Sequence, residues 1–395
     1  MKIGNREIGL NHPPYIIAEI GVNHDGDVER ALQLTDAAAD ANADAVKLQF
    51  FETDRLMSKA AKLAAYQKNA GETDPIEMLR RLELNIDEMA QVVERAHTKG
   101  IHAIVTVFST ELVEIAETLP WDAYKTASPD IMNKPLLEAL MHTSKPMIVS
   151  TGASTTDEVV QAVGWLETAR NRLAVLQCVS SYPAPDPALG GMRVLQRQLD
   201  LPIGYSDHTK THKSGRLAVA FGACVLEKHI TDNRNRSGPD HLASLLDAHF
   251  AEYIKLANEG LEWREAVDRA FENNVHLIES GKELKEYAFS DAEPGNGHPA
   301  WYGIHAAFNS KLTKQVLDCE QDVRTVSRQS VVSTTDIPEG TTITRDMLTI
   351  KRPGTGILAC DLESVIGCTT AQPIEADVPI NAADLVQFET SMARL

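Results

Sequence analysis

Two histidines occupy matched places in the chain, and together they could bind a metal ion. His208 follows the apolar segment 201–206, and His229 ends the apolar segment 224–230. Residues 215–222 have helical spacing, so we expect two parallel strands joined by a helix. Both imidazoles would then face one pocket, an arrangement that suits a divalent metal. The alternative is that they are packed or surface histidines, since the chain has 13.

Two lysines lie inside apolar segments, where an unpaired charge would be costly. Lys47 stands in AVKLQF (45–50) and Lys125 in DAYKT (122–126). Lysines flanked by serine and threonine suit a phosphate group, because the ammonium supplies charge and the hydroxyls supply directional donors. We interpret these lysines as parts of a phosphate site. The alternative is that both are surface lysines.

One acid, Glu19, lies within the apolar segment 15–21. A carboxylate held among apolar neighbours can transfer a proton to or from a reacting oxygen. The alternative is a structural role, in which Glu19 only neutralises Lys47 or Lys125.

The elements that must position these residues are eight short apolar segments that alternate with helical ones. The expected strands are residues 15–21, 44–50, 101–108, 122–126, 146–150, 172–179, 201–206 and 224–230. This alternation predicts an α/β protein with a (β/α)8 TIM barrel. A doubly wound sheet is the alternative, but no GxGxxG follows the first strand. TIM-barrel active sites lie at the C-terminal ends of the strands, where the candidate residues fall.

Changes in composition divide the chain into three parts. Residues 1–274 are expected to form the barrel. Residues 275–328, rich in Gly, Pro, Asn and aromatic side chains, are expected to be a linker or insertion. Residues 329–395 alternate β-rich segments with turns and predict a small β-rich domain.

Charge and composition exclude several classes of protein. The chain has 38 basic and 56 acidic residues and a net charge of -18, which argues against a nucleic-acid-binding protein. Its apolar segments are shorter than the roughly 20 residues that span a bilayer. The N-terminus lacks a signal peptide, and five scattered cysteines suit a reducing compartment. We therefore expect a cytoplasmic protein.

Eight motifs in order along the chain resemble the N-acetylneuraminate (sialic acid) synthase family, that is, NeuB-like proteins. They are IAEIGVNHDGD (17–27), AVKLQFF (45–51), VSTGAS (149–154), SSYPAP (180–185), GYSDHT (204–209), EKHIT (227–231), GPDH (238–241) and IKRPGTG (350–356). The C-terminal part resembles the SAF, or antifreeze-like, domain of that family. The resemblance covers nearly the whole chain.

The resemblance implies an enzyme that condenses phosphoenolpyruvate with an N-acetylated mannosamine-type sugar to a nine-carbon 2-keto acid, releasing phosphate. It implies Mn2+ or Mg2+ held by His208 and His229, with Glu19 beside the reacting aldehyde. The implied phosphoenolpyruvate-binding residues are Lys47, Thr106, Lys125, Ser128, Ser150 and Ser206, and the implied sugar-binding residues are Gln49, Tyr182, Asp240 and Arg352. Arg352 would enter the active site of the other subunit of a domain-swapped homodimer.

Some residues depart from the family pattern. Ser180 stands where the family often has Asn, Asp130 stands where it often has Glu, and residues 275–325 form a longer and more aromatic stretch. These departures leave the acceptor sugar open: the resemblance favours N-acetylneuraminate synthase, with a legionaminate or pseudaminate synthase as the alternative. A Schiff-base aldolase using Lys47 or Lys125 and a non-catalytic carbohydrate-binding protein are more distant alternatives.

Overall fold

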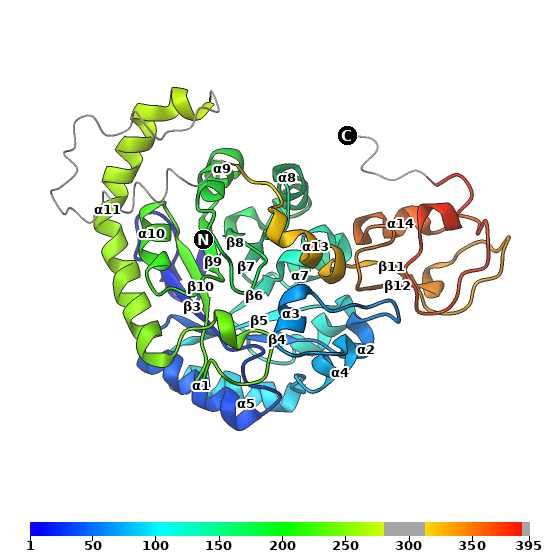
Figure 1. The fold of residues 1–395 in the computed structure, drawn as a ribbon, viewed down its shortest axis with the longest axis horizontal. Coiled ribbons are helices and arrows are strands. Elements are labelled where there is room, and N and C mark those ends of the chain that lie inside the picture. Colours follow the sequence, from blue (N-terminus) through cyan, green and yellow to red (C-terminus); the bar gives the residue numbers. More distant parts are fainter. Residues whose placement is uncertain (280–312, 389–395) are drawn as a thin grey trace.

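The computed structural model describes residues 1–279 and 313–388 (Figure 1). Eight parallel strands close into a barrel in the order β10-β3-β4-β5-β6-β7-β8-β9. The strands are β3 (Tyr15–Glu19), β4 (Ala45–Phe50), β5 (His102–Val107), β6 (Ala123–Thr126), β7 (Met147–Ser150), β8 (Leu173–Cys178), β9 (Ile203–Asp207) and β10 (Val225–His229). Each coincides with a predicted strand to within two residues at either end. The closed barrel confirms the TIM-barrel prediction and excludes the doubly wound sheet.

Helices surround the barrel, and short polar residues begin several of them. The main helices are α1 (Val28–Asp40), α5 (Ile86–Thr98), α6 (Val113–Ala116), α7 (Lys134–His142), α8 (Thr156–Trp165), α9 (Gly190–Leu199), α10 (Ser214–Ala220) and α11 (Asp247–Glu279). Asn85 and Thr155 each accept a backbone N–H at the start of α5 and α8, and Glu88 and Glu158 complete the capping boxes. Three short helices, α2 (Thr53–Leu56), α3 (Ala65–Asn69) and α4 (Pro75–Arg80), fill the insertion after β4.

Helix α8 ends at Trp165, and a 3-10 segment, Glu167–Arg172, follows it. Helix α11 runs to Glu279, past the predicted barrel boundary at residue 274. Within residues 1–279 and 313–388, no helix is both long and apolar enough to cross a membrane.

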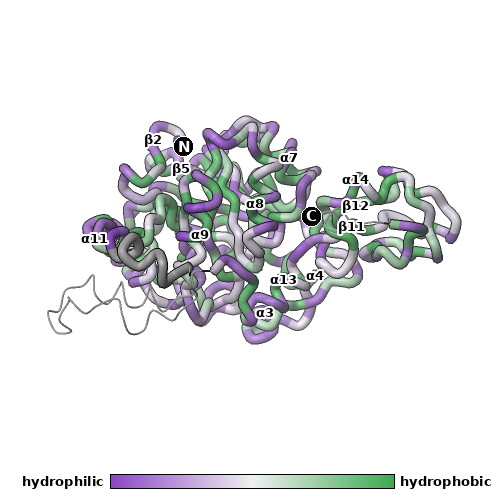
Figure 2. Tube along the Cα trace, turned by 90° about the horizontal axis from the view of Figure 1, so that it is seen from above, coloured by the Kyte–Doolittle hydropathy of each residue, from purple (hydrophilic) through white to green (hydrophobic). Residues whose placement is uncertain are grey.

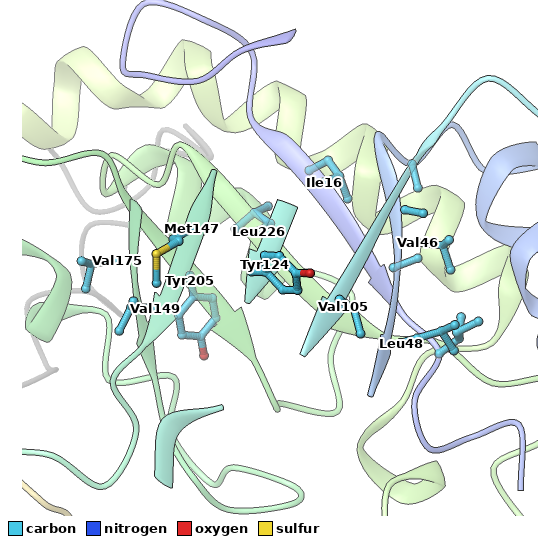
Figure 3. Packing of buried hydrophobic residues seen from close by; sticks show 14 of the residues in the cluster. Ile16, Val46, Leu48, Val105, Tyr124, Met147, Val149, Val175, Tyr205 and Leu226 are labelled. Atoms are coloured by element: carbon cyan, nitrogen blue, oxygen red, sulfur yellow. The ribbon is translucent and has the colours of Figure 1, made fainter. Parts of the chain in front are cut away.

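The barrel strands bury both faces, because alternate side chains point to the helices and to the barrel interior. The outward side chains pack beneath the helices in one continuous cluster (Figure 3), which includes Ile16, Val46, Leu48, Val105, Tyr124, Met147, Val149, Val175, Tyr205 and Leu226. Ile17, Ile104 and Ile148 belong to a second apolar cluster, which fills the lower part of the interior. Ile3, from the N-terminal hairpin of β1 (Lys2–Ile3) and β2 (Arg6–Glu7), joins that cluster. Polar side chains occupy the upper interior.

The C-terminal domain has its own small apolar core, with Val331, Ile343, Val365 and Ile380 among its members. Its regular strands, β11 (Ser330–Ser333) and β12 (Leu348–Lys351), pair antiparallel. Elsewhere in its described part, isolated bridges and short helical turns replace the strands expected of a β-rich domain. Proline and glycine in segments such as IPEG and RPGTG interrupt ladder pairing. The domain lies beside the barrel, away from α11 (Figures 1 and 2).

Candidate active site

All but one of the predicted site residues line a single cavity at the C-terminal end of the barrel. These residues are Glu19, Lys47, Gln49, Thr106, Lys125, Ser128, Tyr182, Ser206, His208, His229, Asp240 and Arg352. Most of them end a strand or lie just after one, where the closing of the barrel brings them together. Their meeting follows from the fold, because inward-pointing residues of neighbouring parallel strands share one interior.

Ser150 is the exception. It ends β7 and is completely buried, but it is not among the residues that line the cavity. Its hydroxyl has no hydrogen-bond partner in the described part of the chain. A contact between Ser150 and phosphoenolpyruvate therefore stays a prediction.

The two lysines are buried rather than exposed, with 1% of Lys47 and 6% of Lys125 accessible to solvent. The Lys47 ammonium bonds to the Glu19 carboxylate and donates to Thr106 Oγ1 at 3.0 Å. Lys125 Nζ lies 3.2 Å from Glu227 Oε1, and Lys47 Nζ lies 3.9 Å from Glu227 Oε2. The alternative that both are surface lysines is wrong. The two buried ammonium groups lie close together, on either side of the Glu227 carboxylate.

Glu227 is a site residue that we did not predict. Although burial opposes its ionisation, Lys125 and Lys47 outweigh that effect and lower its pKa to about 2, aided by the Ser206 hydroxyl at 3.0 Å. It stands two residues before His229 on β10, and residues two apart on a strand point to the same side. This spacing in the sequence could have identified Glu227 as a residue that faces the same pocket as His229. Glu227 therefore stays ionised and fixes the positions of the two ammonium groups, which can then bind an anion.

Glu19 forms the ion pair that one of the two interpretations from the sequence expected. It is an ion-pair partner of Lys47, and its Oε1 accepts the Gly21 N–H at 2.8 Å. Burial nevertheless raises its pKa to about 7, against the lowering effect of Lys47. A carboxyl group that changes protonation near pH 7 suits general acid–base catalysis.

His208 and His229 lie side by side in the cavity, with ring centroids 5.8 Å apart. His208 Nδ1 donates to the Val179 carbonyl at 2.7 Å, which leaves its Nε2 free to act as a ligand. Burial lowers the pKa of His229 well below its usual range, so this ring is neutral, and its Nδ1 is buried without a partner among the described residues. A neutral imidazole on His229, beside a His208 ring whose Nε2 is unused, fits a divalent metal.

In the described part of the chain, no group of three or more His, Cys, Asp or Glu side chains is arranged to hold a metal. The histidine pair alone would hold the ion. A site with so few protein ligands leaves positions for water or substrate, as catalytic metal sites do.

Aromatic and apolar side chains form the outer part of the cavity. The Tyr182 ring lies 4.0 Å from the His208 ring, and Tyr66 lies 4.8 Å from Tyr182. Burial raises the pKa of Asp240 to about 6, although His208 counteracts this effect. Tyr66 comes from the insertion after β4, which the sequence showed only as a polar stretch, so nothing there marked it as a site residue. Other residues that line the cavity are apolar, among them Val22, Phe51, Leu56, Met78 and Leu79.

Arg352 reaches the cavity from the C-terminal domain. Its backbone N–H donates to the Leu56 carbonyl at 2.8 Å, and its carbonyl accepts the Ser58 N–H at 3.0 Å. The guanidinium lies 5.4 Å from the centre of the Phe108 ring. In this single chain Arg352 lines the cavity of its own barrel, so its placement in a partner subunit stays a prediction.

Asp130 lies near Arg352 and is completely buried. Burial raises its pKa to about 7, although Arg352 and Lys125 oppose the shift. Gln329 donates to Asp130 Oδ1 at 2.9 Å, while Asp130 Oδ2 has no partner among the described residues. This departure from the family pattern therefore lies close to the cavity.

Part of the predicted linker is built into the rim of the barrel. The Glu320 carboxylate accepts the N–H groups of Ala153 and Ser180, each at 2.7 Å, in the loops after β7 and β8. Between those loops, a Cβ on Gly152 would approach Ser180 Oγ to 2.2 Å, so only glycine fits this close packing. The sequence held no signal for Glu320, because its partners lie about 150 residues away. Residues 280–312 of the predicted linker lie outside the described residues.

Comparison with known proteins places the chain in a family. The NeuB family model matches residues 34–262, and the SAF domain model matches residues 328–386. The chain is 32% identical to the N,N'-diacetyllegionaminic acid synthase of Legionella pneumophila over 94% of this chain and 95% of that protein. It is 31% identical to the N-acetylneuraminate-9-phosphate synthase of Homo sapiens, over 88% and 85% of the two chains.

A solved structure agrees over almost the entire length. The spore coat polysaccharide biosynthesis protein SpsE of Bacillus subtilis superposes with a TM-score of 0.75 and 26% identity, covering 98% of this chain and 99% of that chain. The family model alone matches more than half of the chain, and the fold and the order of the motifs agree with it. The resemblance inferred from the motifs is thus confirmed, and the chain belongs to the NeuB family and carries a C-terminal SAF domain.

Proposed function

We propose that this protein is a nonulosonic acid synthase that condenses phosphoenolpyruvate with an N-acetylated mannosamine-type sugar. The products are a nine-carbon 2-keto acid and phosphate. One observation carries the proposal: two buried lysines and a titratable glutamate share one cavity with a pair of histidines that could bind a metal.

The lysine side of the cavity suits phosphoenolpyruvate. This substrate carries a phosphate and a carboxylate, and Lys47 and Lys125 supply the matching charge, with hydroxyl groups on Thr106, Ser128 and Ser206 nearby. Preorganised donors of this kind stabilise charge that develops as phosphate departs.

The histidine side suits the aldehyde. His208 and His229 would hold a divalent metal, Mn2+ or Mg2+, which when bound supplies Lewis-acid polarisation of the carbonyl oxygen. Tyr182, whose ring is in contact with the His208 ring, and Asp240, near His208, are placed to orient the sugar.

The protein groups then divide the work of the reaction. The lysines hold the enol while its terminal carbon forms the new bond to the aldehyde carbon. Glu19, in its ionised form, takes a proton from the water that adds to the carbon bearing the phosphate, and this proton passes to the former aldehyde oxygen, which becomes a hydroxyl. The second proton of the water leaves with the phosphate, and the carbon becomes the keto group. The same lysines stay with the phosphate as it leaves by cleavage of the bond between carbon and oxygen.

N-acetylmannosamine, giving N-acetylneuraminate, is the first candidate acceptor. The apolar wall formed by Val22, Leu56, Met78 and Leu79 favours a second one, a 2,4-diacetamido-2,4,6-trideoxyhexose, whose C6 is a methyl group. This acceptor leads to a legionaminate- or pseudaminate-type product. The L. pneumophila relative, a legionaminate-type synthase by name, agrees with the second candidate.

The deciding assay is phosphate release from phosphoenolpyruvate with Mn2+. It compares N-acetylmannosamine, its 6-phosphate and the 2,4-diacetamido-2,4,6-trideoxyhexoses that would lead to a legionaminate-type and to a pseudaminate-type product. Turnover with one sugar names the acceptor. Absence of turnover with all of them would contradict the proposed function.

The structure argues against the Schiff-base alternative. Both lysines pair with carboxylates, and Glu19 and Glu227 raise the pKa of Lys47 above its usual value despite burial. A protonated amine is not a nucleophile. Borohydride treatment with substrate should therefore leave no covalent adduct. A purely carbohydrate-binding role would leave the buried lysines and histidines without a purpose.

Replacing Lys125 by Met is expected to raise the KM for phosphoenolpyruvate at least tenfold, because a charge-assisted hydrogen bond is worth about 1.5–3 kcal/mol. The KM for the sugar should change little. Lys134→Met serves as the control, because Lys134 is a partly exposed lysine of α7. This variant should behave as wild type. Equal effects on both KM values would contradict this assignment.

We further propose that the working form is a domain-swapped homodimer in which Arg352 serves the partner. The C-terminal domain has a separate core, so it can dock on either barrel with the same contacts. Arg352→Ala and Glu19→Gln variants, each expected to lose nearly all of its activity, are mixed after reversible dissociation. If the arginine acts across subunits, one site in each mixed dimer is intact, and up to about a quarter of wild-type activity should return. If Arg352 acts within its own chain, whose cavity it lines in this structure, no activity returns.

A further inference from the structure

The reaction uses side chains that point into the barrel, but the residues between them point outward and form a network of their own. Asp207 ends β9 and directly precedes His208, and Lys228 precedes His229 on β10. Lys228 Nζ lies 3.2 Å from Asp207 Oδ1, and both side chains are completely buried, at 0% exposure. The two residues are register partners across the β9–β10 ladder.

Every charged atom of this pair has a further partner. The Asp207 carboxylate accepts the Thr209 N–H at 2.9 Å, the Thr209 hydroxyl at 2.8 Å and the Ser214 hydroxyl. Lys228 donates to the Thr209 carbonyl and lies 6.0 Å from the centre of the Tyr253 ring. Asp207 and Thr209, on either side of His208, thus both bind Lys228, the residue before His229.

A buried ion pair is a costly way to hold two strands together. Removing both charges from water offsets much of their attraction, and well-packed apolar residues often stabilise a fold at least as well. Two residues before Asp207 and Lys228, the outward-pointing side chains are apolar. They are Tyr205 on β9 and Leu226 on β10, and both belong to the main core. The charges of Asp207 and Lys228 at the next outward positions therefore need an explanation other than stability of the fold.

We propose that the Asp207–Lys228 pair sets the spacing and orientation of His208 and His229 and thereby the affinity for the metal. Neither residue lines the cavity, so both would act as positioning residues. Partners that orient a metal-binding histidine commonly change affinity 10- to 100-fold when lost. This inference rests on the metal site of the proposed function.

The test measures Mn2+ binding without substrates, by electron paramagnetic resonance of free Mn2+. Lys228→Met is the first variant, because Asp207 keeps its three donors from Thr209 and Ser214. We expect Mn2+ affinity to fall 10- to 100-fold. Phosphoenolpyruvate binding, measured in chelator, should stay within about twofold, because Lys47 and Lys125 are untouched.

Glu158→Gln provides the matched control. Glu158 is also buried and bonded to cations, Arg324 and Arg328, but it lies in α8, away from the histidines. This variant should lose thermal stability while binding Mn2+ as wild type does. A loss of Mn2+ affinity here as large as in Lys228→Met would mean that any weakened fold weakens the site, and the proposal would be wrong.

The double variant Asp207→Leu/Lys228→Met covers the case in which the single variant does not fold. An apolar pair restores packing but not the hydrogen bonds to Thr209, so we expect recovered stability with Mn2+ affinity still at least tenfold weaker. Wild-type Mn2+ affinity in either folded variant overturns the inference and leaves the proposed function intact. Failure of the wild-type protein to bind Mn2+ overturns both.

Discussion

His229→Ala is expected to lower turnover by roughly three orders of magnitude, and exhaustive treatment with a chelator should do the same to the wild-type protein. Lewis-acid assistance is worth several kcal/mol, and each 1.4 kcal/mol is a factor of ten in rate. The variant should still bind phosphoenolpyruvate, because the lysines and their hydroxyl neighbours remain. Steady-state phosphate release and direct binding measure the two effects separately.

The control for this prediction is His212→Ala. His212 is four residues after His208, but it pairs with Glu252 outside the cavity. It should retain full activity and the same response to the chelator. Undiminished turnover of wild-type protein stripped of metal would show that the histidines serve another purpose.

Glu19→Gln is the second large effect, with an expected loss of 10²- to 10⁴-fold in kcat, the usual contribution of a positioned acid or base. The pH profile carries the sharper test. The folded pKa of about 7 means that the carboxylate form dominates above pH 7 and is lost as the pH falls. If Glu19 is the base, wild-type kcat/KM should fall tenfold per pH unit below about 7, and the residual activity of the variant should lack this limb.

Asp130 is the matched control, since burial also raises its pKa to about 7. Asp130→Asn should therefore keep the acidic limb if Glu19 causes it. A limb that disappears in Asp130→Asn and persists in Glu19→Gln would move the role of base to Asp130.

The barrel could be predicted from the sequence because its signals are local. Short apolar segments and capping residues such as Asn85 and Thr155 decide where strands and helices begin. The fold then brings the strand ends together, so Lys47, Lys125 and His229 meet without any further information. Glu227 was open to prediction by the same alternation, since it lies two residues before His229 on one strand.

Other parts of the site depend on contacts between distant segments, which no local pattern reveals. Tyr66 enters from an insertion whose composition is that of a surface loop. Glu320 contacts Ala153 and Ser180 across more than 100 residues of chain. The interrupted strands of the C-terminal domain arise from the particular placement of proline and glycine, which periodicity alone does not resolve.

The seating of Glu320 and Arg352 at the barrel rim has a consequence for how this family can diversify. Both residues lie in the last quarter of the chain, yet one shapes the loops around the cavity and the other forms part of its wall. Recombination near residue 313 would exchange these contributions as a block while leaving the histidines and lysines untouched. New acceptor preferences can therefore arise by shuffling of gene segments, and chimeras joined at this point are a direct route to engineering them.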